Sequence, residues 1–301
     1  MKGTGMETAA KRSVWKVQGD FITRIKAAYN QFTRAEKRVA DYVLKEPRRV
    51  LFLSITDLAE ESGVGETSVF RFCKTLGLNG YQEFKMRLSL SLSQGDDDLD
   101  QFAGKSVTLS DSFSQVAQKV LKASVETLNE TCMLLKEEDV NRVIGLFDRA
   151  GSIFFFGVGG SMLTAMKAMN KFLRIEPKVR CLPDTHMQAM AAAVMGKGDV
   201  AVLFSYSGAT KDTIHVAKLA KEAGAAVVCI TRFVKSPLTV YADVTLLSGA
   251  NEGPFQSGST SSEISQMFLV DLLYTEYYRR FFKRCSRYNE RSAASVVERL
   301  C

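Results

Sequence analysis

Residues 200–210 read VAVLFSYSGAT, an unbroken apolar run that stops at a turn rich in serine and glycine. A short apolar run bounded by turn residues is typical of a parallel strand that is buried on both faces. Gly208 has no side chain, so it permits close approach of the backbone to a bound anion. The stretch therefore predicts a buried strand, Val200–Phe204, that carries a polar turn to the carboxyl edge of a parallel sheet.

The same alternation of strand and helix extends to both sides of this stretch. We expect strands at Ile153–Phe156, Val179–Cys181, Val200–Phe204, Val227–Ile230 and Val244–Leu247. Helices of suitable length separate the first four strands, which is typical of βαβ units. A last amphipathic helix is expected from about Ser261 to Phe282, and the C-terminal part of the chain is therefore predicted to be an α/β domain. Apolar residues of this helix that are candidate oligomer contacts, with burial in the core as the alternative, are Ile264, Met267, Phe268, Val270 and Leu272.

A second glycine-rich turn, GVGGS at residues 157–161, follows the first predicted strand. Both turns lie where a strand ends and a helix begins, and the N-terminus of a helix offers free N–H groups and partial positive charge to a phosphate. Ordinary helix capping is the alternative, which two such turns in one sheet make less favourable. The expected anion site includes Ser205, Ser207, Gly208, Thr210, Gly159, Gly160 and Ser161.

Residues 21–92 have helical periodicity throughout. Thr33 followed by Glu36 is a capping-box pattern that predicts a helix start, and Pro47 is expected to end that helix. Ser54 marks a further helix start. This part of the chain is therefore predicted to be an all-helical domain.

Four residues in this region have the spacing of a helix-turn-helix. Ala59 is small where two helices would cross, and Gly63 permits the turn between them. Val69 and Phe72 would pack the second helix against the first. The second helix of such a motif lies in the major groove of DNA, with its N-terminal residues facing the base edges. The expected DNA-binding residues are Glu66, Thr67, Ser68, Arg71 and Lys74.

Positive charge is concentrated in the same part of the chain. Residues 1–95 carry 16 Lys and Arg against 10 Asp and Glu, whereas the rest of the chain carries 24 against 23. A local excess of positive charge suits a polyanion, and Arg can bind guanine with two hydrogen bonds. A packing motif with a solvated basic surface is the alternative, and we favour double-stranded DNA as the partner.

Several protein classes are excluded by composition and motif spacing. The six cysteines are scattered with no CxxC pair, which argues against a disulfide framework and a zinc site, and we expect no metal. Met162 stands where a dinucleotide fingerprint requires glycine, so no such cofactor is expected. Charged residues interrupt every apolar stretch, and the features of a signal peptide are missing, so we expect a cytoplasmic protein with no membrane partner.

The chain is predicted to consist of two domains with connecting and terminal segments. The expected divisions are a tail at 1–20, a helix-turn-helix domain at 21–92, a linker at 93–111, an α/β ligand domain at 112–283 and a C-terminal tail at 284–301.

Longer motifs resemble those of a known family. They are VFRFCKTLG at 69–77 and SYSGAT at 205–210, with DLA at 57–59, GYQEFK at 80–85, SPL at 236–238 and DLLY at 271–274. In this order they resemble the RpiR family of bacterial transcription regulators, whose C-terminal part is a sugar isomerase (SIS) domain. The resemblance covers about residues 21–282.

The resemblance implies an all-α helix-turn-helix domain followed by an α/β domain with a five-stranded parallel sheet flanked by helices. It implies a regulator of sugar-metabolism genes that forms dimers or larger oligomers. A phosphorylated sugar would be bound by the turn at Ser205–Thr210, with help from Gly159–Ser161, and would extend toward Glu263 and His186. Glu263 stands where a basic residue is commoner in this family.

A phosphosugar isomerase is the alternative function, because SIS domains also occur in isomerases. Aldose–ketose isomerisation needs a general base near C1 and C2 of the sugar. The candidates are His186, which follows the second predicted strand, His215, which is expected inside a helix, and Glu263. No convincing set of bases emerges and a DNA-binding domain is attached, so we expect a sensor rather than an enzyme.

Overall fold

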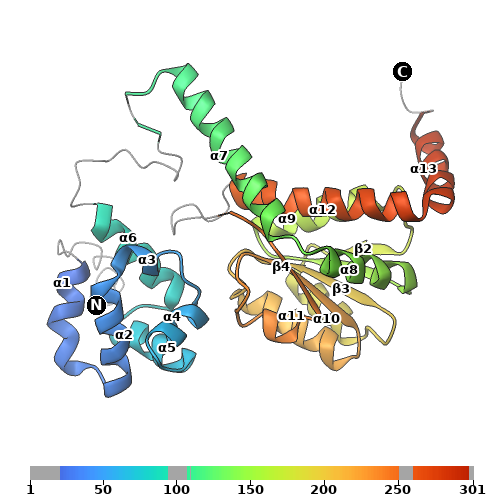
Figure 1. The fold of residues 1–301 in the computed structure, drawn as a ribbon. Coiled ribbons are helices and arrows are strands. Elements are labelled where there is room, and N and C mark those ends of the chain that lie inside the picture. Colours follow the sequence, from blue (N-terminus) through green and yellow to red (C-terminus); the bar gives the residue numbers. More distant parts are fainter. Residues whose placement is uncertain (1–20, 94–106, 109, 251–259, 298–301) are drawn as a thin grey trace, which may run out of the picture.

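The computed structural model describes residues 21–93, 107–108, 110–250 and 260–297. They form a helical N-terminal domain and a larger α/β C-terminal domain (Figure 1). The expected tail at 1–20 and most of the expected linker at 93–111 lie outside the described residues. Within the parts that the structure describes, no helix combines the length and the apolar character needed to cross a membrane.

The N-terminal domain contains only helices, as predicted. They are α1 (Phe21–Ala28), the 3₁₀ helix η1 (Tyr29–Gln31), α2 (Arg34–Lys45), α3 (Pro47–Val50), α4 (Ile55–Glu61), α5 (Glu66–Thr75) and α6 (Tyr81–Ser93). A single core made mainly of aliphatic and phenylalanine side chains joins them, with Phe72 and Phe84 at its centre and their rings 5.5 Å apart.

Local sequence signals explain where these helices begin. Thr33 accepts a hydrogen bond from the N–H of Glu36, and Glu36 accepts one from the N–H of Thr33, so the predicted capping box at the start of α2 is confirmed. Ser54 and Asp57 form the same arrangement at the start of α4. Pro47 occupies the first turn of α3, where its missing N–H leaves no donor unpaired.

In the part of the C-terminal domain that the structure describes, five strands form one parallel sheet in the order β2-β1-β3-β4-β5. The strands are β1 (Ile153–Phe156), β2 (Val179–Cys181), β3 (Val200–Phe204), β4 (Ala226–Thr231) and β5 (Val244–Leu247). Four match the predicted bounds, and β4 is one residue longer at each end. β3 is buried along its whole length at the centre of the sheet, as its apolar run predicts.

Helices cover both faces of the sheet. They are α8 (Glu137–Arg149), α9 (Gly160–Phe172) and α12 (Thr260–Arg280) on one face, and α10 (Thr185–Ala193) and α11 (Lys211–Glu222) on the other. Alternate residues of β3 divide between the two cores: Val202 packs toward α8, α9 and α12, and Leu203 packs toward α10 and α11. A short 3₁₀ helix, η2 (Thr239–Tyr241), precedes β5.

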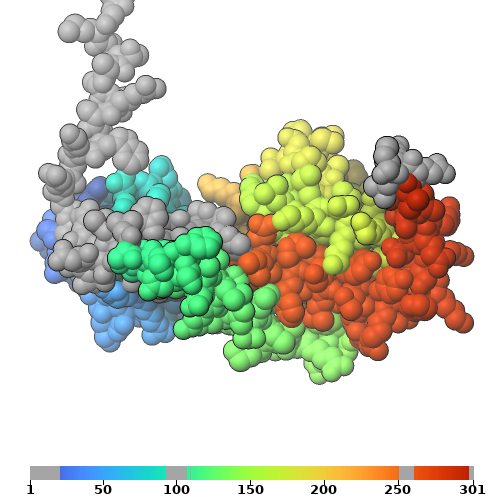
Figure 2. Space-filling view, turned by 90° about the horizontal axis from the view of Figure 1, so that it is seen from above, coloured from blue at the N-terminus to red at the C-terminus, as the bar shows by residue number. Residues whose placement is uncertain are grey.

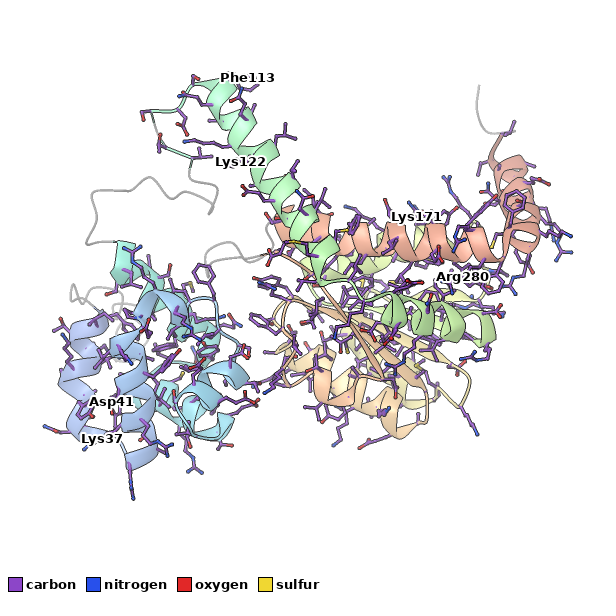
Figure 3. The ribbon with its side chains drawn as sticks, viewed as in Figure 1. Lys37, Asp41, Phe113, Lys122, Lys171 and Arg280 are labelled. Atoms are coloured by element: carbon purple, nitrogen blue, oxygen red, sulfur yellow. The ribbon has the colours of Figure 1, made fainter. Side chains whose placement is uncertain are left out.

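Two further helices extend beyond this three-layer body. The first turns of α7 (Phe113–Leu134), where Phe113 and Lys122 are labelled, project away from it (Figure 3). Seen from above, green α7 lies over the region between the blue N-terminal domain and orange-red α12 (Figure 2). The second is α13 (Phe282–Val297), which turns away from the end of α12 (Figure 1).

The helix α13 corrects the expectation of a tail from residue 284. It is anchored by Arg284, whose guanidinium donates to Asp148 at 2.9 Å and to the Tyr277 hydroxyl at 2.7 Å. Tyr277 in turn donates to the buried Glu176 at 2.6 Å. Asp148 is 136 residues away in the sequence, whereas Tyr277 lies only seven residues before Arg284. Residues 298–301 lie outside the described part of the chain.

The apolar residues of α12 turn out to be largely core residues. Val270 is fully buried, while Met267, Phe268 and Leu272 pack against the same core. Burial therefore accounts for most of the apolar surface that the sequence offered as a candidate oligomer contact.

Candidate functional site

The turn at Ser205–Thr210, called the β3 loop here, connects β3 to the N-terminus of α11. The N–H of Ser205 continues the sheet ladder by donating to the carbonyl of Ile230 at 3.1 Å. The Ser205 hydroxyl is buried and has no hydrogen-bond partner among the described residues. A buried hydroxyl without a partner costs free energy unless something else satisfies it, so this atom is available to a bound molecule.

The rest of the β3 loop brings further donors to the same edge of the sheet. Gly208 adopts a positive φ of 59°, which glycine accommodates without strain. The Ser207 hydroxyl accepts from the N–H of Ala209 at 3.2 Å and keeps its proton for another acceptor. Thr210 is the residue before α11, and its side chain makes no capping bond. Hydroxyls and N–H groups therefore gather at the positive end of α11.

The turn at Gly157–Ser161, called the β1 loop here, connects β1 to α9. A Cβ atom on Gly157 would lie 2.5 Å from the Ser161 carbonyl oxygen, so only glycine fits there. The buried amide of Gln188, a residue that the sequence analysis did not select, donates to the Gly157 carbonyl at 3.0 Å and fixes the loop from α10. Because β1 and β3 are parallel neighbours, the β1 and β3 loops lie at the same sheet edge.

The other expected ligand contacts differ in their surroundings. Glu263 lies in the first turn of α12 and forms an ion pair with Lys167 of α9, which the sequence analysis also missed. His186 is an exposed residue in the first turn of α10. His215 is exposed in the middle of α11, as expected for a surface position of that helix. Within the described residues, no group of three His, Cys, Asp or Glu side chains could hold a metal ion.

The segment Arg232–Leu238, called the β4 loop here, supports the β3 loop from behind. The N–H of Leu238 donates to the carbonyl of Gly208 at 2.9 Å. The N–H of Arg232 donates to the carbonyl of Tyr206 at 3.1 Å, and the Tyr206 ring packs edge-on against Phe233 with centroids 6.0 Å apart. The β4 loop includes the SPL motif, whose role no local pattern revealed.

A cavity of about 650 Å³ lies at the opposite, amino edge of the sheet and is lined by Arg149, Lys197 and Lys221 among others. It adjoins the C-terminal ends of α8 and α11, where basic side chains balance the partial negative charge of the helix. Lys221 already pairs with Asp243. The amino edge of the sheet is therefore a less favourable place for an anion than the carboxyl edge, where the N-termini of α9 and α11 lie.

The helix-turn-helix predicted from spacing is formed by α4 and α5. Gly63 adopts φ of 62° in the turn, and the N–H of Val64 donates to the carbonyl of Ala59 at 2.8 Å. Val69 and Phe72 are fully buried and pack α5 into the core, as predicted.

The expected DNA contacts lie on α5, and most of them face outward. Thr67, Arg71 and Lys74 are exposed, and Ser68 is half-buried. Lys74 lies 5.3 Å from the centre of the Phe70 ring, which is also exposed. Glu66 instead accepts a hydrogen bond of 2.5 Å from Thr56 of α4, so its carboxylate braces the two helices. The outward face of α5 therefore offers hydroxyl and cationic groups, whose chemistry suits phosphates and base edges.

Comparison with protein-family models identifies both domains. Residues 19–95 match the model described as "Helix-turn-helix domain, rpiR family", and residues 146–276 match the SIS domain model. An HTH-type transcriptional regulator of Haemophilus influenzae is 36% identical over 85% of this chain and 89% of its own length. One from Caldanaerobacter subterraneus is 34% identical over 91% of this chain and 96% of its own length.

Solved structures agree with this assignment. Vibrio vulnificus NanR, complexed with ManNAc-6P, superposes with a TM-score of 0.82 at 28% identity and covers 93% of this chain and 99% of its own. The sugar isomerase domain of an RpiR transcription factor from Sphaerobacter thermophilus shares the fold, with a TM-score of 0.54 at 21% identity over 62% of this chain and 99% of its own. The chain therefore belongs to the RpiR family of transcriptional regulators, with an N-terminal helix-turn-helix domain and a C-terminal SIS domain.

Proposed function

We propose that this regulator binds an operator through α5 and responds to a phosphorylated sugar bound at the β3 loop. The observation that carries the ligand site is the buried Ser205 hydroxyl, which has no partner among the described residues and belongs to the loop that leads into the N-terminus of α11. Ser207, Thr210 and the backbone around Gly208 supply further donors. No lysine is needed within the loop, because the helix itself provides partial positive charge.

The sugar would extend from its phosphate toward the β1 loop, where Gly159, Gly160 and Ser161 begin α9. Glu263, held by Lys167, and the exposed His186 are the proposed contacts to its hydroxyl groups. The similarity to NanR, whose structure contains ManNAc-6P, supports a sugar phosphate as the class of effector. Control of sugar-metabolism genes and action in the cytoplasm form part of this proposal.

Sensing is favoured over isomerisation by the surroundings of the candidate bases. Glu263 is paired with a cation, and His186 and His215 are exposed on helix surfaces rather than enclosed at the β3 loop. An isomerase needs its base positioned against the sugar's reacting carbons. Prolonged incubation of the protein with each phosphosugar, followed by NMR, should show no conversion.

The test of the site is a titration of the full chain with glucose 6-phosphate, fructose 6-phosphate and N-acetylmannosamine 6-phosphate. A ligand that binds only the folded state raises the melting temperature and gives a heat of binding in calorimetry. The double variant Ser205→Ala/Ser207→Ala should lose both signals while its circular dichroism is unchanged. Ser124→Ala on α7 is the matched control. Equal affinity of parent and double variant would place the effector elsewhere.

A further inference from the structure

The β4 loop touches the DNA-binding domain as well as the β3 loop. The ammonium group of Lys235 lies 2.8 Å from each carboxylate oxygen of Glu60, near the end of α4. The carbonyl of Lys235 lies 3.2 Å from the Ser54 hydroxyl at the start of the same helix. One residue of the SIS domain therefore contacts both ends of the first helix of the helix-turn-helix.

The contact at Ser54 involves the atom that caps α4. The Ser54 hydroxyl accepts from the N–H of Asp57 at 2.9 Å and also lies 2.7 Å from the Asp57 carboxylate. Its single proton can be donated to that carboxylate or to the carbonyl of Lys235, but not fully to both. A shift of Lys235 therefore alters the hydrogen bonding that fixes the start of α4.

The other side of the β4 loop is fixed to the β3 loop. A Cβ atom on Gly208 would lie 2.2 Å from the Ser236 hydroxyl oxygen, so the two segments are in direct contact. Ser236 is buried and adjoins Lys235 in sequence, and consecutive Cα atoms are only about 3.8 Å apart. A single residue, Ser236, therefore separates the contact with the β3 loop backbone from Lys235.

A third contact joins the β4 loop to α7. Arg232 forms an ion pair of 2.9 Å with Glu130, and both side chains are half-buried. Glu130 lies near the C-terminal end of α7, and the chain between the two domains leads into the N-terminal end of that helix. The β4 loop is thus bonded to the β3 loop, to α7 and to α4.

We propose that the β4 loop couples the β3 loop to the helix-turn-helix, with Lys235, Glu60 and Ser54 forming the interdomain contact. This inference rests on the proposed function, because the signal it carries is occupancy of the β3 loop by a phosphosugar. Binding that moves Gly208 and Ser236 shifts Lys235 and changes how firmly α4 is held. By linkage, operator binding changes phosphosugar affinity by the same factor.

The test uses hydrogen–deuterium exchange of the full chain, with Lys235→Glu, Glu60→Lys and the double variant that exchanges the two charges. Without ligand, Lys235→Glu should raise exchange at residues 55–61 about two- to five-fold, the range that one exposed ion pair supports. The double variant, in which the two charges are swapped, should restore the protection of the amides at residues 55–61. Lys218→Glu is the matched control, because Lys218 forms its ion pair within α11, with Glu222.

The second arm adds N-acetylmannosamine 6-phosphate or glucose 6-phosphate. In the parent and in the double variant with swapped charges, ligand binding should change hydrogen–deuterium exchange both at residues 205–210 and at residues 55–61. In the Lys235→Glu variant, hydrogen–deuterium exchange should change at residues 205–210 alone. An equal response of residues 55–61 in the parent and Lys235→Glu would overturn the coupling and leave the phosphosugar site standing.

If the titration identifies a phosphosugar that binds the chain, absence of protection by that sugar at residues 205–210 would instead contradict the proposed site. The ligand-free arm then decides the interdomain contact by itself. Unchanged exchange at residues 55–61 in Lys235→Glu would overturn that contact.

Discussion

At the scale of single residues, the β3 loop depends on one glycine for two separate reasons. Gly208 has φ of 59°, which strains any residue with a side chain, and it is in contact with Ser236. Gly224, at the end of α11, has φ of 89°. A Cβ atom added there would have its nearest neighbour 3.8 Å away, which is an ordinary contact distance. The two positions therefore separate backbone strain from steric overlap.

We expect Gly224→Ala to cost about 1 kcal/mol of unfolding free energy from strain alone. Gly208→Ala should cost about 2–4 kcal/mol, because the new methyl group must also displace Ser236. Urea unfolding followed by circular dichroism measures both variants. Equal losses in the two would mean that the β4 loop moves aside freely and does not support the β3 loop.

A buried lysine in the N-terminal domain gives a second prediction at this scale. Burial lowers the pKa of Lys85 to about 8, although Asp57 nearby partly opposes this shift. Its ammonium group lies 3.3 Å from the carbonyl of Leu53 and 5.1 Å from the centre of the Tyr81 ring. Below pH 8 both folded and unfolded chains hold the proton, so the folded state bears the full cost of burying the charge.

Between pH 8 and about 10.4 the unfolded chain retains that proton while the folded one releases it, so Lys85 favours folding more as pH rises. The full effect is on the order of 3 kcal/mol. Burial also raises the pKa of Cys73 to about 12, which has the opposite trend. The measured quantity is therefore the difference in unfolding free energy between Lys85→Met and the parent, in which the Cys73 contribution cancels.

In urea unfolding, the difference in unfolding free energy between Lys85→Met and the parent should shift in favour of the parent as the pH rises from about 7.5 to about 9.5. Lys26→Met, at an exposed position of α1, is the control, and its difference from the parent should stay constant. A constant difference for Lys85→Met as well would show that Lys85 is charged at no cost in the folded domain.

At the scale of elements, the sequence predicted those whose signals are local. Continuous apolar runs predicted β1, β3 and most of β4, a capping box predicted the start of α2, and Ser54 predicted the start of α4. The docking of α13 onto the domain could not be predicted from local sequence, because Arg284 is held by Asp148 of α8, 136 residues earlier in the chain.

In the candidate site, too, the features with local sequence signals were predicted and those that depend on distant residues were not. Serine, threonine and glycine at the end of an apolar run predicted the β3 loop and its place at the sheet edge. No local pattern could predict that Ser236 lies against Gly208 or that Gln188 fixes the β1 loop, because the fold alone brings these residues together.

The recognition helix α5 carries its own prediction. Arg71 is exposed on the outward face of α5, so Arg71→Ala should weaken binding to a selected operator by about 1–3 kcal/mol if it contacts a guanine. The operator is obtained by selection from random duplex DNA, and affinity is measured by fluorescence anisotropy. Lys26→Ala is the control, because it removes the same charge from an exposed position on α1, outside the recognition helix. Equal affinities for Arg71→Ala and the parent would remove Arg71 from base recognition.

At the scale of the whole molecule, a single helix-turn-helix contacts only a few base pairs, so we expect a symmetric oligomer that binds an inverted repeat. Two such domains related by a twofold axis contact half-sites about 34 Å apart, which is one turn of DNA. Sedimentation of the full chain at micromolar concentration should therefore show a dimer or a larger assembly.

Operator spacing tests the same expectation on DNA. Inserting about five base pairs between the half-sites rotates one by half a turn, to the opposite face of the duplex, so the two domains can no longer bind together. Affinity should then fall to that of a single half-site, which is measured in parallel as the reference. The phosphate contacts within each half-site remain, so binding to single half-sites and its salt dependence should be unchanged. A monomer in sedimentation, combined with operator affinity that ignores the insertion, would mean that each chain recognises DNA alone, and the twofold arrangement would have to be abandoned.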